Sequence, residues 1–200
     1  VTGVQTCALP ILKAGYRARA AYKLLEIQQR HRVIRANDNV VDLGAAPGSW
    51  LQVIRDLTQG TVVGVDLNPI VPMEGVTTIT GDFTDPFVQG RIREAIGGIV
   101  NVVVSDAAPK LSGQKSYDQA WAIGLGEDAL AFACTILKPG GNLVIKSFQG
   151  ELFEGLLAKM RTNFYSVRVY QTKASRKGSA EVYIIAKKFK GTCDGAEGPL

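Results

Sequence analysis

The chain has 200 residues, 46% of them hydrophobic, and a formal net charge of +5; this suits one domain with a single core and leaves no room for a second full domain. Its single histidine excludes His-based triads and multi-histidine metal sites, so we expect no metal, and any general base must be Lys, Asp or Glu. Three isolated cysteines without a C-x-x-C pair indicate neither a disulfide framework nor a zinc site, and we expect a reducing, cytoplasmic compartment.

The charge is unevenly distributed along the chain. Residues 13–35 hold seven basic and one acidic side chain, and residues 159–190 hold nine and one. The middle, residues 36–158, holds seven basic and fourteen acidic side chains. Basic flanks favour binding of an anionic polymer, and an acidic middle favours a cationic or hydroxyl-rich small ligand; a solvated basic surface is the alternative. No apolar run approaches the roughly 18 residues of a membrane span, so no membrane partner is expected.

The predicted elements begin after residue 11. Residues 1–11 look like the conceptual translation of a sequencing-adapter oligonucleotide, so we treat them as an artefact that replaces the native beginning. Residues 17–30 carry apolar side chains at helical spacing and predict an amphipathic helix. Lys23 lies off its apolar stripe, so its amine is free to reach another part of the molecule.

Strands and helices then alternate. The predicted strands are 39–43, 61–66, 76–80, 101–105, 142–146, 166–171 and 181–187, and the predicted helices are 49–57, 87–96, 117–137 and 151–161. This alternation predicts an α/β fold, a doubly wound, mostly parallel seven-stranded sheet. Only about ten residues separate the last two strands, too few for a crossover helix, so the final strand should be antiparallel. We take 12–190 as one domain and 191–200 as a flexible tail.

A small-residue turn follows the first predicted strand. Gly44 and Gly48 leave out side chains where a carboxylate or phosphate of a ligand would have to approach the backbone. The turn lacks the G-x-G-x-x-G pattern of dinucleotide sites and the Gly-Lys-Ser/Thr ending of a Walker loop. Asp66, Asp82 and Asp106 follow three other strands, and these strand ends suggest one ligand pocket.

Three chemically useful side chains are expected at the same edge of the sheet. Asp106 and Lys146 end parallel strands at the carboxyl edge, and an antiparallel last strand begins at that edge with Glu181. Read one at a time, Lys146 could be a snorkelling surface lysine and Glu181 a strand-edge charge, with Lys23 an exposed helix residue. Their joint placement favours a catalytic site.

From Tyr16 to about Phe189 the sequence resembles the RrmJ/FtsJ family of RNA ribose 2′-O-methyltransferases. The stretches that carry the resemblance are Arg19 to Leu24, Asp42 to Trp50, Gly81 to Phe83, Ser105 to Pro109, Leu143 to Gln149 and Ser175 to Tyr183. The resemblance implies a Rossmann-like methyltransferase fold that binds S-adenosylmethionine through Gly44, Gly48, Trp50, Asp66, Asp82, Phe83 and Asp106. It also implies a catalytic tetrad made of Lys23, Asp106, Lys146 and Glu181.

A ribose 2′-hydroxyl is a poor nucleophile and needs a base or a positive field beside it. We assign Lys146 as the proton acceptor, oriented by Asp106, while Glu181 and Lys23 position the ribose. Whether Lys146 takes the proton or only steers the hydroxyl stays open at this point. Phosphate contacts are expected from the basic side chains Arg17, Arg19, Arg168, Lys173, Arg176 and Lys177.

The expected activity is methylation of a ribose, that of a uridine, in large-subunit ribosomal RNA by a monomeric enzyme. The strand before Asp106 continues as Ala107-Ala108-Pro109 without the aromatic residue of amino-group methyltransferases, which favours oxygen over nitrogen as the acceptor. Transfer RNA or an mRNA cap is the alternative substrate. A non-catalytic RNA-binding module is the alternative of another class, disfavoured because a binder has no need of a buried lysine beside two carboxylates.

Overall fold

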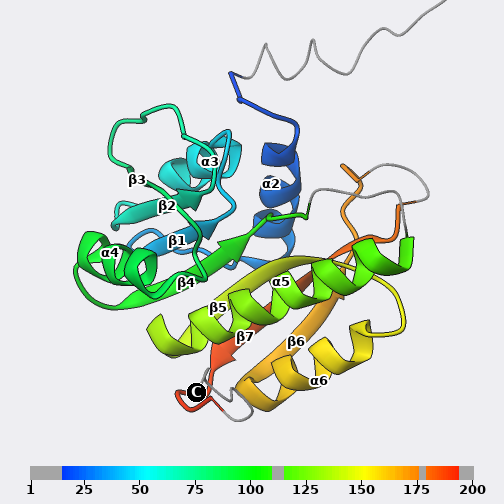
Figure 1. Ribbon diagram of the computed structural model, residues 1–200. Helices are drawn as coiled ribbons and strands as arrows, with labels where there is room; N and C mark the ends of the chain where they lie inside the picture. The colour runs from blue at the N-terminus through cyan, green and yellow to red at the C-terminus, as the bar shows by residue number, and fades with distance from the viewer. Residues whose placement is uncertain (1–14, 110–114, 176–178, 194–200) are drawn as a thin grey trace, which may run out of the picture.

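The fold is built on one seven-stranded sheet in the order β3-β2-β1-β4-β5-β7-β6 (Figure 1). The computed structural model describes residues 15–109, 115–175 and 179–193. Its strands are β1 (Val40–Leu43), β2 (Val62–Asp66), β3 (Thr77–Thr80), β4 (Val100–Ser105), β5 (Leu137–Phe148), β6 (Phe164–Tyr170) and β7 (Glu181–Phe189). Strands β1 to β5 pair in parallel, and β7 is antiparallel to both of its neighbours. The predicted mostly parallel sheet with an antiparallel final strand is confirmed.

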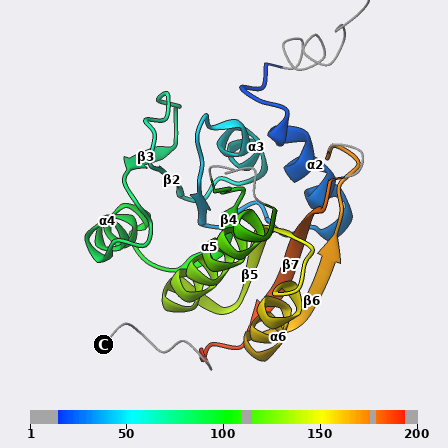
Figure 2. The ribbon, with the colours of Figure 1, turned by 45° about the vertical axis from the view of Figure 1, so that its right-hand side comes forward.

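Helices cover both faces of this sheet. Helices α2 (Ala20–His31) and α3 (Ser49–Leu57) lie on one face, and α4 (Pro86–Ile96), α5 (Lys115–Ile136) and α6 (Phe153–Asn163) lie on the other (Figures 1 and 2). Each layer of helices has its own apolar cluster against the sheet. None of the helices in the described part of the chain is long and apolar enough to cross the hydrocarbon core of a membrane.

The central strands are short runs of β-branched residues because both of their faces are covered. All four residues of β1 are buried, and five of the six in β4 are buried. Val40 belongs to the cluster beneath α2 and α3, and Val41 belongs to the opposite cluster, as the alternation of side chains along a strand requires. Asp42 is the exception in β1, since it is a fully buried acid.

The strand register brings distant segments to one edge. Leu43 of β1 lies opposite Ser105 of β4, and Ser105 lies opposite Ile145 of β5. The glycine turn after β1, Asp106 after β4 and Lys146 in β5 therefore share the carboxyl edge. Because β7 runs the other way, its first residue, Glu181, pairs with Phe148 at this same edge.

Two predicted starts are wrong by three residues or more, and the other boundaries agree within about two residues. The first helix begins at Ala20 instead of Arg17, because Arg17 is held in an irregular segment by hydrogen bonds to Gln52 of α3 and to the turn at Pro47. Strand β5 begins at Leu137, not at Asn142, because Leu137 already pairs with Val100 before the register shifts ahead of Asn142. The helix ends before the Pro-Gly-Gly sequence. This sequence forms a bulge within β5 and does not postpone the start of the strand.

Cysteine usage also departs from expectation. Cys134 in α5 and Cys193 form a disulfide, although the spacing of the three cysteines indicates none. The two residues are 59 positions apart, and no local spacing pattern reports such a pair. Cys7 and the predicted artefact at residues 1–11 lie outside the described residues.

Candidate active site

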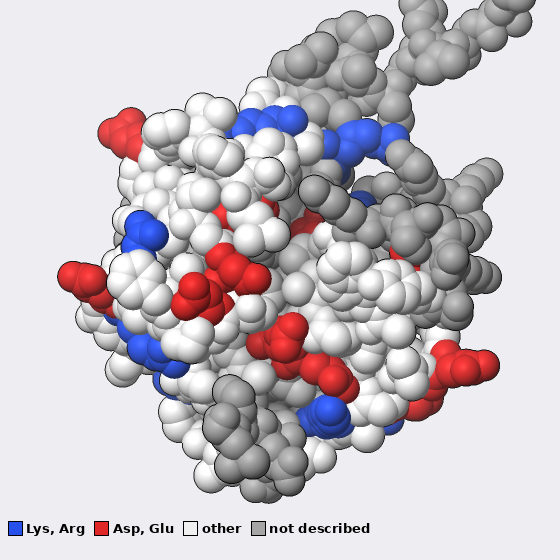
Figure 3. All heavy atoms as spheres, in the orientation of Figure 1, with Lys and Arg blue, Asp and Glu red and all other residues white. Residues whose placement is uncertain are grey.

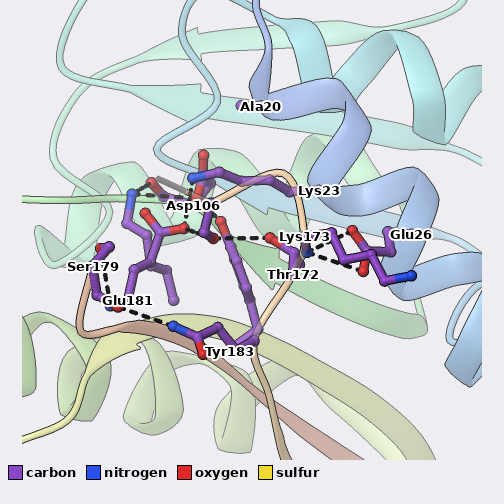
Figure 4. A network of polar contacts seen from close by, with 12 residues as sticks. Ala20, Lys23, Glu26, Asp106, Thr172, Lys173, Ser179, Glu181 and Tyr183 are labelled. Carbon is purple, nitrogen blue, oxygen red and sulfur yellow. Dashed lines mark hydrogen bonds and ion pairs between the residues drawn. The ribbon is translucent and has the colours of Figure 1, made fainter. Parts of the chain in front are cut away.

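Two ion pairs occupy the carboxyl edge of the sheet. Nζ of Lys23, from α2, lies 2.7 Å from Oε1 of Glu181, from β7, with side chains 16% and 14% exposed. Nζ of Lys146, from β5, lies 3.2 Å from Oδ1 of Asp106 and also donates to the Asp106 backbone carbonyl. The four residues expected as a tetrad therefore form one cluster, drawn from α2, β5, β7 and the position that follows β4. Figure 4 labels Lys23, Asp106 and Glu181 of this cluster.

Tyr183 joins the two ion pairs. Its phenol donates a 2.6 Å hydrogen bond to Oδ1 of Asp106, and the ammonium of Lys23 lies 5.8 Å from its ring centroid. Tyr183 pairs directly with Lys146 across β5 and β7, so their side chains share one face of the sheet. Sequence reasoning missed this residue; the signal was its position two residues after Glu181, since alternate residues of a strand point to the same side.

Ser175 is a second residue that sequence reasoning missed. Its hydroxyl donates a 2.7 Å hydrogen bond to the same Oε1 of Glu181 that accepts from Lys23. The residue lies in the loop between β6 and β7, where no strand or helix pattern locates it. Glu181 is thus held from two sides, by a helix and by a loop.

Burial and charge set the protonation of this cluster. Burial by itself would raise the pKa of Glu181, but hydrogen bonds from Lys23 and Ser175 and the nearby ammonium of Lys146 outweigh it, so the pKa is lowered. Burial, with the negative charges of Asp106 and Glu181, raises the pKa of Tyr183 well above its usual range. Glu181 is therefore an anion at neutral pH, and Tyr183 stays protonated and can donate.

The glycine turn has a physical cause in addition to the expected one. Gly44 and Gly48 have φ values of +73° and +100°, which L side chains rarely adopt. A Cβ on Gly44 would lie 2.6 Å from that of Ala107, and one on Gly48 would lie 2.5 Å from Nη1 of Arg17. The positive φ values, and at Gly44 the close backbone of Ala107, already require glycine without a ligand. The contact of Gly44 and Gly48 with a cofactor stays a prediction.

Arg17 holds this turn against a neighbouring loop. Its guanidinium donates to the carbonyls of Pro47 at 3.1 Å, Val71 at 2.8 Å and Pro72 at 3.1 Å. These bonds link the turn to the segment after β2, on the side where the expected ligand pocket lies. The proposed phosphate contact of Arg17 stays a prediction, and its present role is to tie two loops together.

The acids at the ends of β2 and β3 bond to their own loops. Asp66 accepts from the backbone N–H of Ala46 at 3.0 Å and from that of Asn68 at 2.8 Å, so it fastens the glycine turn. Asp82 accepts from the backbone N–H and hydroxyl of Thr84 through Oδ1. Each carboxylate retains further lone pairs, so both can still accept from a ligand.

Two aromatic residues proposed as cofactor contacts lie in the core. Trp50 is 2% exposed, packs 5.8 Å from the Tyr183 ring and donates its indole N–H to the carbonyl of Ala20. Phe83 is 7% exposed and belongs to the apolar cluster beneath α4 and α5. Their side chains support the walls of the site, and direct contact with a cofactor stays a prediction.

The acids at this edge suit a cofactor that carries positive charge and hydroxyl groups, such as S-adenosylmethionine. Asp42 lies beneath the glycine turn, and both of its carboxylate oxygens are buried without a hydrogen-bond partner among the described residues. Burial, with the negative charges of Asp106 and Asp66, raises its pKa well above the usual range. The negative charges of Asp66 and Asp106 beside this buried acid favour a cationic ligand over a phosphate.

The basic residues expected to contact RNA are spread more widely. Arg19 lies at the start of α2, Lys173 after β6, and Arg168 on the edge strand β6, and all three are exposed. Lys173 donates to Glu26 through its backbone N–H, so its side-chain ammonium does not take part in this hydrogen bond. Arg176 and Lys177 lie outside the described residues.

The sheet order and the cluster at its carboxyl edge define the class of protein: an α/β protein of the methyltransferase type, with its site where the strand order reverses between β1 and β4. The FtsJ-like methyltransferase family matches residues 16–189. The chain belongs to this family, as its resemblance predicted.

Individual relatives agree with this assignment. Ribosomal RNA large subunit methyltransferase E of Methanoculleus marisnigri is 82% identical over 189 residues, covering 94% of this chain and 93% of that protein. A solved structure described as a ribosomal RNA methyltransferase of Plasmodium falciparum is 26% identical with a TM-score of 0.80, covering 88% of this chain and 100% of that one. A methyltransferase of Streptococcus mutans in complex with SAH shares the fold at 14% identity and a TM-score of 0.53, covering 85% of this chain and 95% of that one.

Proposed function

We propose that this protein transfers a methyl group from S-adenosylmethionine to a ribose 2′-hydroxyl, that of a uridine, in large-subunit ribosomal RNA. The observation that carries the proposal is the cluster in which Lys146 is paired with Asp106 and Lys23 with Glu181 at the cofactor edge. The family and the high identity to a large-subunit ribosomal RNA methyltransferase support the reaction class and the RNA.

The cofactor supplies an activated methyl group on a sulfonium. The chain's own task is to bring the ribose hydroxyl into line with it and to remove the hydroxyl proton. Lys146 accepts that proton on Nζ, and Asp106 holds the amine through two contacts while Tyr183 holds Asp106. Glu181, an anion, accepts from the ribose and is itself fixed by Lys23 and Ser175.

Residues around the glycine turn would hold the cofactor. Asp66 has carboxylate lone pairs for ribose hydroxyls, and Asp82 has them for an amino group of the base. The backbone at Gly44 and Gly48 provides the floor of the pocket. Asp42, buried beneath the turn with both carboxyl oxygens unpartnered among the described residues, is a further acid at this place.

The proton acceptor must be a neutral amine. Its partner is Asp106, 3.2 Å away, and an ammonium has no lone pair with which to accept the hydroxyl proton. Methyl transfer is therefore expected to accelerate as the pH rises, as a base mechanism requires. A rate that does not depend on pH would favour a steering role for Lys146.

The deciding experiment offers the protein methyl-labelled S-adenosylmethionine together with unmodified large-subunit RNA, assembled large subunits or transfer RNA. We expect label in the large-subunit arms and none in transfer RNA. Labelled RNA is then hydrolysed in alkali, which requires a free 2′-hydroxyl to cleave the chain. Label recovered in a resistant dinucleotide supports ribose methylation, and label in mononucleotides would place the methyl on a base and overturn the proposal.

A further inference from the structure

A basic groove lies at the end of α2 that is remote from the tetrad. It encloses about 330 Å³ and is lined by Arg30, His31, Tyr165, Arg168, Lys187 and Lys188, together with Ser166 and Ile185. Four of these side chains are permanent cations, and no Asp or Glu is among the described residues that line it. A second hollow shares Lys187 and adds Arg32 and Arg35, again without an acid in its described lining.

These cations lack the ion pairs found in the active site. Arg168 and Lys188 make no ion pair within the described part of the chain, and Arg30 lies over the ring of Tyr170. Lys187 donates to the backbone carbonyl of His31 at 2.9 Å. Glu26, one turn before Arg30 on α2, accepts from the Tyr170 hydroxyl and from the backbone N–H of Lys173, and it is not among the residues that line the groove.

The crowding is strong enough to affect titration. Burial and then the charges of Arg168, Arg30 and Lys187 lower the pKa of His31. Burial and then Arg35, Lys188 and Arg168 lower the pKa of Lys187. The Nε2 atom of His31 is buried without a hydrogen-bond partner in the described structure. A bound anion would offset the repulsion among these cations and would favour protonation of the His31 imidazole.

The backbone is distorted so that two successive lysines face one groove. Neighbouring residues of a strand point to opposite sides of the sheet, so Lys187 and Lys188 of β7 should diverge. Lys188 has a φ of +62°, one of two positive values among the described non-glycine residues, and both lysines line the groove. The strained conformation of Lys188 thus adds a fourth cation to the groove.

The groove lies on the same face of the sheet as the tetrad. Glu181, Tyr183, Ile185 and Lys187 alternate along β7, and Tyr183 and Ile185 both pack beneath α2. Lys187 lies six positions after Glu181 along β7, a distance of about 20 Å. The opposite face, covered by α5 and α6, shows acidic side chains at its middle and basic ones toward its edges (Figure 3).

We propose that this groove binds phosphate groups of the substrate RNA at a distance from the ribose that is methylated. The inference rests on the proposed function, since it takes RNA to be the substrate. An RNA strand that enters the tetrad can continue along the α2 face, where the unpaired cations of Arg30, Arg168, Lys187 and Lys188 meet its backbone.

The salt dependence of RNA binding tests the proposal. The Arg168→Gln/Lys188→Gln double variant removes two exposed cations of the groove, and Arg91→Gln/Lys138→Gln removes two exposed cations elsewhere. With a fragment of large-subunit RNA, the groove variant is expected to bind about 10- to 30-fold more weakly at 0.1 M salt. Its slope of log affinity against log salt should fall by between one and two, as the loss of two phosphate contacts requires.

The control variant should retain the parent slope, and both variants should retain the parent affinity for S-adenosylmethionine, which reports on folding. Equal slopes for parent and groove variant would overturn the proposal. Normal binding to naked RNA with weakened binding to whole subunits would also overturn it, because the groove would then contact ribosomal protein.

A second measurement reports on the groove directly. His31 is the only histidine in the chain, so its imidazole proton resonance is unambiguous in protein without a histidine tag. Addition of the same RNA fragment should raise the pH at which His31 titrates, and Arg168→Gln/Lys188→Gln should reduce this rise. No shift with saturating RNA would contradict the proposal. If the RNA binds and shifts His31 but no methyl is transferred, the proposed function fails and the groove stands.

Discussion

The two ends of α2 differ in whether the basic side chains around them are paired with acids. At the first end, Lys23 is paired at 2.7 Å with Glu181, and Lys146 nearby is paired with Asp106. At the other end, Arg30, Lys187, Lys188 and Arg168 share a groove without an acidic side chain in its described lining. Helix α2 thus connects a site whose cations are paired with acids to a groove whose cations are not.

The difference corresponds to two physical tasks. A proton transfer needs donors and acceptors at fixed positions, and ion pairs with hydrogen bonds hold them there. Binding a polyanion needs uncompensated positive charge, which gains free energy by releasing counterions and is weakened by salt. Changes at the paired end should therefore alter rate and stability, and changes at the unpaired end should alter RNA affinity.

The largest effect is expected from Lys146→Ala. Removal of a general base costs about a hundredfold or more in rate, so methyl transfer should fall by at least that factor while cofactor binding persists. Single-turnover kinetics with saturating RNA measures this. Lys138→Ala, an exposed lysine of the same strand, is the matched control. Full activity of Lys146→Ala would show that the paired end is structural.

A double-mutant cycle on Lys23 and Glu181 should give the next largest effect. Both side chains are mostly buried, so either Lys23→Met or Glu181→Gln leaves one charge without its partner and should cost about 1–3 kcal/mol of unfolding free energy. The double variant should lose less than the sum of the two. Denaturant unfolding of the four proteins measures the coupling; additive losses would show that the pair contributes nothing to folding.

A smaller effect of opposite sign is expected from Lys188→Gly. Glycine adopts the φ of +62° without strain, so the substitution should stabilise the protein by about 0.5–1 kcal/mol. Lys187→Gly, at the preceding position in β7, should destabilise it. Chemical unfolding and RNA affinity measured together should show that Lys188→Gly gains stability and weakens RNA binding. A loss of stability would remove the argument that strain is kept here for function.

The smallest effects are expected in the pH dependence of the unfolding free energy, which should differ between the two ends of α2. The pKa of His31 is lowered from 6.5, so its contribution to stability is complete above pH 6.5 and is lost as the pH falls through the lowered value. The pKa of Glu181 is lowered from 4.5, so its contribution is lost only at pH below 4.5. Unfolding free energies measured from pH 3 to 8 should show both losses. His31→Gln should abolish the first and Glu181→Gln the second; one shared transition would contradict the separation.

Much of the fold was predictable because it depends on local patterns. Runs of valine with few charges, such as β1 and β4, indicate strands buried on both faces, and the short distance between Gln171 and Glu181 indicates an antiparallel end. The Cys134–Cys193 disulfide and the early start of β5 were not predictable. Both depend on which distant segment lies opposite, and no spacing along the chain reports that.

The site was predictable to the extent that strand ends converge. Asp106 follows β4, Lys146 lies two residues before the end of β5 and Glu181 begins β7, all at one edge. Lys23 lies off the apolar stripe of α2. Tyr183 was missed because a tyrosine within an apolar strand is usually core, and here it is both core and a hydrogen-bond donor. Arg17 was expected only as an RNA contact, and its bonds to three carbonyls become visible only when the loops are placed.

The sequence by itself determined the order of strands and helices, the family and the residue types available for chemistry, because periodicity and motifs are properties of neighbouring residues. The tertiary structure alone decided that Lys23 pairs with Glu181, and that Arg30, Arg168, Lys187 and Lys188 gather in one groove. Electrostatic energy depends on distances between side chains, and those distances are set by the packing of α2 against β5, β6 and β7.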